Sequence, residues 1–149
     1  MTTSLVPAAE GVAACRMVEL PSVRSEGLGE LSFIEAERHV PFEIRRVYCL
    51  YDVPAGGLRG GHAHLQLQQL LVALSGSLDV VVNDGHSEAR FRLLHRNQGL
   101  YLPRMVWRDL ENFSGGAVCM VLASQHFDES DYIRKWDDFA SLVEAGTRA

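Results

Sequence analysis

The sequence has few cysteines, and none of them is spaced as in a metal-binding or redox motif. Cys15, Cys49 and Cys119 are far apart, and the last two lie in apolar runs. Isolated cysteines in apolar segments are typical of small core residues in a reducing compartment, which argues against a disulfide-stabilised secreted domain. We therefore expect a cytoplasmic protein.

Long hydrophobic runs and a strong excess of positive charge are also missing. No apolar run approaches the length of a membrane span, and the N-terminus lacks a basic segment followed by a continuous apolar one. The net charge of −5 is dispersed along the chain. These features argue against membrane insertion and against general nucleic-acid binding. A length of 149 residues, 47% of them hydrophobic, predicts one domain over residues 1–149.

What the sequence contains is a series of short strand-like segments separated by turn residues. The segments are rich in β-branched and aromatic residues, and Gly, Pro, Asn or Asp follows most of them. Eight or more such strands predict an all-β domain of the sandwich, jelly-roll or barrel type. We expect strands over 15–20, 31–35, 44–51, 62–74, 78–82, 89–94, 100–102, 106–110 and 117–123.

The two ends of the chain follow different patterns. Residues 1–14 are small and polar, and we expect a loose N-terminal arm there. After Ser130, a residue suited to cap a helix, Ile133, Trp136, Ala140 and Val143 fall on one helical face. The pattern predicts one C-terminal α-helix over 130–145, packed on the β body.

The most informative stretch is Arg59–His64, with the sequence RGGHAH. Side chains alternate along a strand, so the imidazoles of His62 and His64 point to the same side. The spacing G-x5-HxH-x4-Q-x6-G around this stretch resembles the first cupin motif, with Gln69 in place of the motif's glutamate. A looser second motif has Arg108 where cupins have a histidine.

These two departures argue against a metal site. In metal-binding cupins the glutamate and the later histidine complete the ligand set that the first two histidines begin. Here one position holds the neutral Gln69, and the other holds Arg108, whose guanidinium cannot coordinate a cation. We therefore predict that no metal is bound and that the histidines are free for acid–base chemistry.

A neutral imidazole is a favoured general base near pH 7. Arg59 and Arg108 would keep His62 and His64 neutral and would stabilise developing negative charge, a pattern that indicates proton abstraction next to a carbonyl. Tyr48, from the preceding strand, could supply a second proton-transfer group. The alternatives are that the histidines are a relic with satisfied hydrogen bonds and that Tyr48 is a core residue. Arg46 and Arg104, likewise, could be no more than solvated surface residues.

A wider set of motifs resembles the nucleotide-sugar 3,4-ketoisomerase family of RmlC-like cupins. The resemblance covers roughly residues 27 to 139, and the DESDYIR and RGGHAH stretches are its most specific parts. The matching motifs are Val40–Tyr48, Arg59–His64, Gly99–Pro103, Val106–Trp107, Val121–Ser124 and Asp128–Arg134. Relatives usually have Trp-His where this chain has Trp107 and Arg108, and a bulkier residue at the position of Gly61.

The resemblance implies a cupin double-stranded β-helix, or jelly roll, that forms a homodimer and uses no metal or organic cofactor. It implies an isomerase that moves the ketone of dTDP-4-dehydro-6-deoxy-D-glucose from C4 to C3, in deoxyamino-sugar biosynthesis for a lipopolysaccharide or antibiotic glycan. The face on which C4 is reprotonated then decides between a gluco and a galacto product. The resemblance also implies that His62 is the base and that His64 and Tyr48 assist proton transfer.

Arginines are suited to bind the diphosphate in fork geometry, and the candidates for substrate and phosphate binding are Arg59, Arg46, Arg108 and Arg104. Three other functions stay open at this point. An RmlC-like nucleotide-sugar epimerase would use the same histidine base, and a metal-dependent cupin oxygenase would need a metal. A non-catalytic sugar-binding cupin would bind a ligand without turnover.

Overall fold

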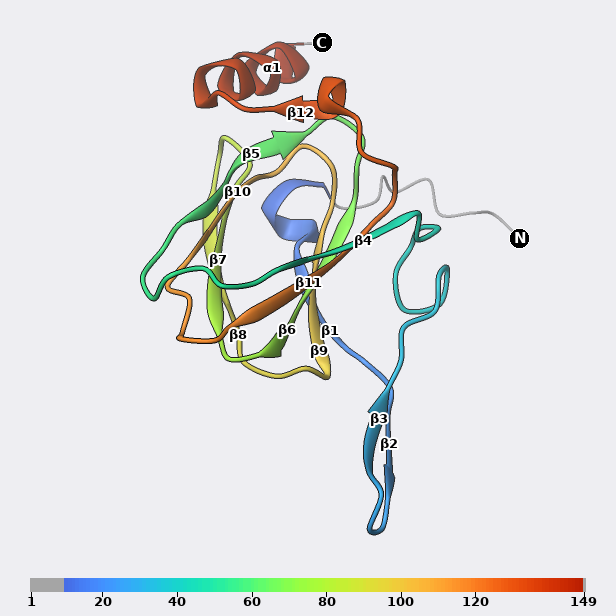
Figure 1. Ribbon diagram of the computed structural model, residues 1–149. Coiled ribbons are helices and arrows are strands. Elements are labelled where there is room, and N and C mark those ends of the chain that lie inside the picture. Colours follow the sequence, from blue (N-terminus) through green and yellow to red (C-terminus); the bar gives the residue numbers. More distant parts are fainter. Residues whose placement is uncertain (1–9, 149) are drawn as a thin grey trace, which may run out of the picture.

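Two antiparallel sheets of five strands each pack against one another through their inner faces (Figure 1). The computed structural model describes residues 10–148. The first sheet has the order β1 (Arg16–Glu19), β9 (Gln98–Leu102), β6 (Gln69–Ser75), β11 (Val118–Ala123), β4 (Arg46–Leu50). The second has the order β12 (Tyr132–Ile133), β5 (Arg59–His64), β10 (Trp107–Glu111), β7 (Leu78–Asn83), β8 (Glu88–Leu93). The all-β jelly roll with one C-terminal helix is thus confirmed.

The main core lies between the two sheets. Leu71, Leu100 and Val121 from the first sheet meet Val80 and Leu110 from the second, and all five are buried. Because side chains alternate between the two faces of a strand, each strand turns one row of apolar side chains inwards. A second cluster covers the outer face of the first sheet, which explains why the first five residues of β6 are all buried.

The predicted strand over 62–74 is wrong, because the chain crosses there from one sheet to the other. β5 ends at His64 and β6 begins at Gln69. The four residues between them form a turn in which Asp131 accepts the backbone N–H groups of Gln66 and Leu67. This turn places the two ends of the predicted strand in opposite walls of the molecule.

The ends of the chain also differ from the prediction. Residues 1–9 of the expected N-terminal arm lie outside the described residues. Gly11–Ala14 form a 3-10 helix, η1, which is held by a bond from the Val12 N–H to Asp84 and has Ala14 buried. The helix α1 covers Trp136–Arg148 and begins six residues later than predicted. A short 3-10 helix, η2 (Glu129–Asp131), precedes β12, and Asp128 rather than Ser130 provides its cap.

The chain also forms a hairpin that was only partly predicted. β2 (Ser22–Ser25) and β3 (Gly29–Ser32) pair only with each other and project away from the body (Figure 1). Of the two cysteines expected in the core, Cys119 is buried, but Cys49 is exposed on the edge strand β4, and Cys15 is buried as well. No helix within residues 10–148 combines the length and the apolar character needed to cross a membrane.

Candidate active site

A cavity of about 530 Å³ opens between the two sheets. Arg46, Tyr48 and Gln69 reach it from the first sheet, while His62 and Arg108 reach it from the second. The structure therefore brings together the base, the phenol and three of the arginines predicted from the sequence, Arg59 included.

A β-bulge sets the position of His62. His62 lies opposite Arg108 in the β5–β10 pair, and Gly60 lies opposite Asp109, so Gly61 is the extra residue. Both glycines have a left-handed backbone, with φ of +87° at Gly60 and +71° at Gly61, which other residues rarely adopt. The glycine pair thus lets β5 bend so that His62 lines the cavity.

The His62 imidazole is neutral at pH 7. Burial, and secondarily the positive charge of Arg108, lowers its pKa to about 4. Its ring lies 5.1 Å from the ring of Tyr132 and 4.9 Å from that of His64, measured between centroids. An unprotonated imidazole in a cavity has the protonation state that a general base requires.

His64 lies behind His62 and does not line the cavity. Its side chain is fully buried, and Nδ1 is 3.2 Å from a carboxylate oxygen of Asp131. Burial and Arg108 lower the pKa of His64 to about 2. The Asp131 carboxylate only accepts, so Nδ1 carries the hydrogen. His64 does not line the cavity and its buried Nε2 has no hydrogen-bond partner within residues 10–148, so its direct part in proton transfer stays a prediction.

A chain of hydrogen bonds crosses the cavity floor from one sheet to the other. Arg108 Nη1 donates to Gln69 Oε1, and Gln69 Nε2 donates to the Tyr48 hydroxyl over 3.0 Å. Arg108 also donates to the Val106 carbonyl and is only 2% exposed. Burial raises the pKa of Tyr48 and lowers that of Arg108 to about 10, so both stay protonated at neutral pH.

The remaining predicted arginines occupy different places. Arg46 lines the cavity with its guanidinium over the ring of Tyr48, and its buried Nε and Nη2 have no hydrogen-bond partner within residues 10–148. Arg59 lines the cavity and is exposed. Arg104 does not reach the cavity, because its Nε donates to the Leu65 carbonyl. Arg108 lies at the floor of the cavity with two protein partners, while its buried Nε has none within residues 10–148, so its predicted role in phosphate binding stays a prediction.

The C-terminal segment contributes cavity residues that were not predicted. Tyr132 and Arg134 line the cavity, with the Arg134 guanidinium 4.2 Å from the centre of the Tyr132 ring. The Asp131 carboxylate contacts Nδ1 of His64. The helix predicted over 130–145 includes all three residues, so the prediction missed their place in the site. They lie in the DESDYIR stretch that carried part of the resemblance.

The donor atoms around the histidines do not fit a divalent metal. Gln69 presents its carbonyl oxygen to Arg108 rather than to the histidines, and the buried guanidinium would repel a cation. Within the described part of the chain, no group of three His, Cys, Asp or Glu side chains is arranged to hold a metal ion.

A family model and a relative both match this chain over most of its length. Residues 13–144 match the family described as FdtA: WxcM-like, C-terminal. The TDP-4-oxo-6-deoxy-alpha-D-glucose-3,4-oxoisomerase of Aneurinibacillus thermoaerophilus is 42% identical over 115 residues, which cover 77% of this chain and 83% of that relative.

Solved structures agree with this match. A 3,4-ketoisomerase from Helicobacter canadensis has a TM-score of 0.84 and 36% identity, over 87% of this chain and 97% of its own. QdtA, a 3,4-ketoisomerase from Thermoanaerobacterium thermosaccharolyticum in complex with TDP, has a TM-score of 0.85 and 32% identity, over 89% and 96%. The Mycobacterium tuberculosis RmlC epimerase shares only 16% identity at a TM-score of 0.68, over 87% and 70%, and supports the fold alone.

Proposed function

The chain belongs to the FdtA family (WxcM-like, C-terminal), and we propose how its cavity works as a sugar 3,4-ketoisomerase. The substrate is TDP-4-keto-6-deoxyglucose, which the Aneurinibacillus relative is named for and which is bound in a structure of a QdtA variant. One observation carries the mechanism. The neutral imidazole of His62 and the protonated phenol of Tyr48 line the same cavity, and they come from opposite sheets.

In the proposed reaction His62 removes the proton from C3, which the neighbouring C4 ketone makes acidic. The resulting enediolate carries negative charge near the cavity floor, where the buried Arg108 guanidinium stabilises it. Tyr48 assists the transfer of the hydroxyl proton from O3 to O4. Reprotonation at C4 by the imidazolium of His62 leaves a ketone at C3. His64 contributes indirectly, by packing behind His62.

We assign binding of the TDP phosphates to Arg46 and Arg59. The unpartnered guanidinium nitrogens of Arg46 are buried beside the cavity, and a phosphate oxygen would supply the acceptor that they lack. Phe127 packs under the same guanidinium, with its ring centre 5.7 Å away. The cytoplasmic location and the absence of a metal or organic cofactor stay predictions from the sequence.

The reaction is tested by proton NMR of the protein with TDP-4-keto-6-deoxyglucose in D2O. The ketoisomerase reaction predicts loss of the C3 proton signal together with a new 3-keto species. An epimerase would introduce deuterium at C3 or C5 and leave the ketone at C4. A non-catalytic sugar-binding protein would be stabilised thermally by the sugar nucleotide without any turnover.

The pH dependence of kcat/KM is expected to reflect the low pKa of His62. The acidic limb should have its midpoint near pH 4, the pKa of this imidazole, rather than near the ordinary value of about 6.5. The basic limb should lie near pH 10, where Arg108 loses its charge, because burial lowers the pKa of Arg108 to about 10 and raises that of Tyr48 above its ordinary value. Initial rates across the pH range measure both limbs, and an acidic midpoint near 6.5 would contradict the assignment.

The same low pKa values make the fold less stable in acid. Below about pH 6.5 the unfolded chain binds protons on the two histidines while the native state does not, so stability falls as the pH falls. Tryptophan fluorescence at each pH therefore has to confirm that the protein is folded, so that loss of catalysis is separated from unfolding.

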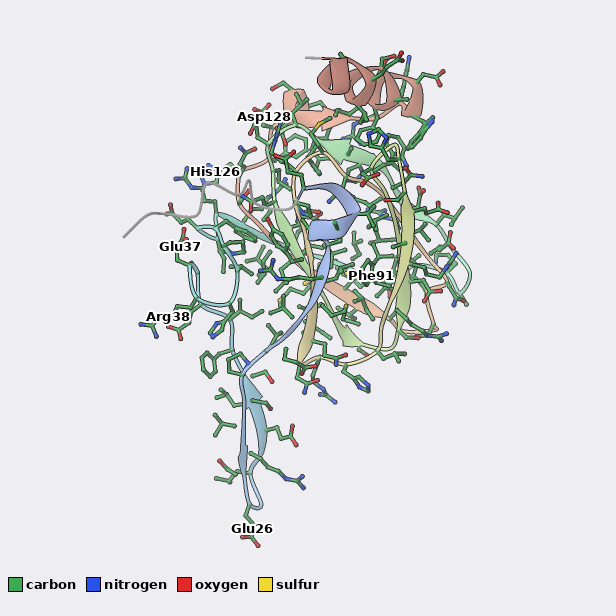
Figure 2. The ribbon with its side chains drawn as sticks, turned by 180° about the vertical axis from the view of Figure 1, so that it is seen from behind. Glu26, Glu37, Arg38, Phe91, His126 and Asp128 are labelled. Atoms are coloured by element: carbon green, nitrogen blue, oxygen red, sulfur yellow. The ribbon has the colours of Figure 1, made fainter. Side chains whose placement is uncertain are left out.

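We propose that the protein is a homodimer in which the β2–β3 hairpin packs on a second copy. All eight residues of the two strands are exposed, and Val23 and Leu31, which pair directly, are 52% and 59% exposed. Figure 2 shows the hairpin extending into solvent as far as Glu26 at its tip. An isolated hairpin with exposed apolar side chains is marginally stable in water, so a partner surface would stabilise it.

Replacing Val23 and Leu31 together by serine is expected to weaken the dimer by at least about 100-fold, because four apolar side chains per dimer lose their burial. Sedimentation velocity over a concentration series measures the change. Leu142→Ser, on the exposed side of α1, removes a comparable side chain and should leave the dimer intact. A Val23/Leu31 variant that dimerises like the unmodified protein would place the interface elsewhere.

A further inference from the structure

The side chains of Gln69 and Arg108 come from opposite sheets and meet in the core, where Gln69 also contacts the Tyr48 hydroxyl. Gln69 lies on β6 and Arg108 on β10, and each is 2% exposed. The guanidinium is held at two points, by the Gln69 side chain and by the Val106 carbonyl. Such a clamped side chain leaves its neighbour little freedom to rearrange.

The chemistry of the guanidinium determines which way round the Gln69 amide lies. Every nitrogen of Arg108 is a donor, so the Gln69 atom beside it has to be the carbonyl oxygen. The opposite orientation would bring an NH2 group against another donor in a buried place, which costs free energy. The amide nitrogen is therefore the atom that lies 3.0 Å from the Tyr48 hydroxyl.

The orientation of the Gln69 amide in turn determines the orientation of the Tyr48 hydroxyl. An amide nitrogen donates and cannot accept, so the Tyr48 oxygen is the acceptor in this bond. The hydroxyl hydrogen of Tyr48 has to point in another direction. Since Tyr48 lines the cavity, that direction is open towards a bound ligand.

We propose that Gln69 and Arg108 are positioning residues that keep the Tyr48 hydroxyl as a hydrogen-bond donor to an oxygen of the bound keto sugar. This rests on the proposed ketoisomerase function. It gives a reason for glutamine at position 69, where the cupin motif has glutamate. A carboxylate there would accept from Arg108 and also from Tyr48, and would turn the phenolic hydrogen away from the substrate.

Gln69→Glu is the direct test, because it keeps the size of the side chain and its bond to Arg108. We expect kcat to fall about 30-fold at pH 8, within the range of a lost proton-transfer interaction, while KM changes less than about threefold. At this pH His62 is unprotonated in both proteins, so a shift in its pKa does not affect the rate. Gln68→Glu is the matched control, since Gln68 accepts from Tyr101 and does not line the cavity, and its kcat should be unchanged.

A double-mutant cycle distinguishes positioning from packing. In a Tyr48→Phe background the hydroxyl is missing, so Gln69→Glu should then cost clearly less than about 30-fold, and the loss that remains measures the partial neutralisation of Arg108 by the carboxylate. Gln69→Met repeats the cycle without a charge: the loss should be smaller, about fivefold, and should also disappear in the Tyr48→Phe background. The proposal is overturned if Gln69→Glu leaves kcat within about threefold of the unmodified protein, or if the loss is the same in both backgrounds.

If Gln69→Glu does not fold, the Gln69→Met cycle decides the question by the same criterion. The rate of the unmodified protein with the 4-keto sugar is measured in the same series. A protein without this turnover would contradict the proposed function itself, whereas normal turnover with an additive cycle would contradict only the role of Gln69 and Arg108.

Discussion

Replacing His62 by asparagine is expected to lower kcat for the isomerisation at least about 1000-fold, because the general base at C3 is lost. Asparagine is polar and of similar size but cannot take up a proton at neutral pH. His62 is only partly buried, so the fold should be kept. Loss of the C3 proton signal in D2O, followed by NMR, reports the step that His62 performs. The exchange and the ketone transfer should fail together.

The control for this experiment is His86→Asn, which changes an exposed histidine in the β7–β8 turn outside the cavity. It should leave kcat unchanged. Binding of TDP to His62→Asn, measured by calorimetry, should stay within a few-fold of the unmodified protein, because the phosphates are assigned to Arg46 and Arg59. Full activity in His62→Asn would exclude this imidazole as the base.

Gly60→Ala is expected to lower both stability and activity. A Cβ at this position would lie 2.9 Å from the Arg108 carbonyl oxygen, and the φ of +87° is unfavourable for any residue with a side chain. Relief of the clash requires β5 to move away from β10. We expect a loss of about 3 kcal/mol in unfolding free energy and about 100-fold in kcat, since His62 and Arg108 face each other across this pair.

Gly61→Ala separates the cost of the left-handed backbone from the cost of the clash between β5 and β10. Its φ of +71° carries a similar backbone penalty, but a Cβ there meets nothing closer than Asp109 Oδ1 at 3.7 Å. It should cost about 1 kcal/mol, the left-handed penalty alone. Thermal unfolding and kcat for both variants give the comparison. Equal losses in the two would show that backbone strain, and not the approach of β5 to β10, determines the effect.

The strands and the histidine pair could be predicted because their signals are local. Alternation of side chains along β5 places His62 and His64 on one side, and the turn residues after each strand are short-range features. The depressed pKa of His62 agrees with the neutral base expected beside Arg108. Local patterns therefore sufficed wherever the determining residues are neighbours in the chain.

The rest of the site depends on contacts between distant residues. Asp131 meets His64 across 67 positions of sequence, and a helical spacing of apolar residues masked the two-residue strand that brings it there. Arg104 and Arg108 are both arginines close to the second motif, yet Arg104 binds the Leu65 carbonyl and Arg108 lines the cavity. Only the three-dimensional packing separates two such residues.

The two-residue strand β12 has a consequence for the order in which the protein acquires its activity during synthesis. His62 leaves the ribosome long before Tyr132, which packs against its imidazole only after β12 pairs with β5. Pairing of such distant segments is slow, because a long loop has to close first. A nascent chain can therefore pair most of its strands before Tyr132 and Arg134, two residues that line the cavity, are in place.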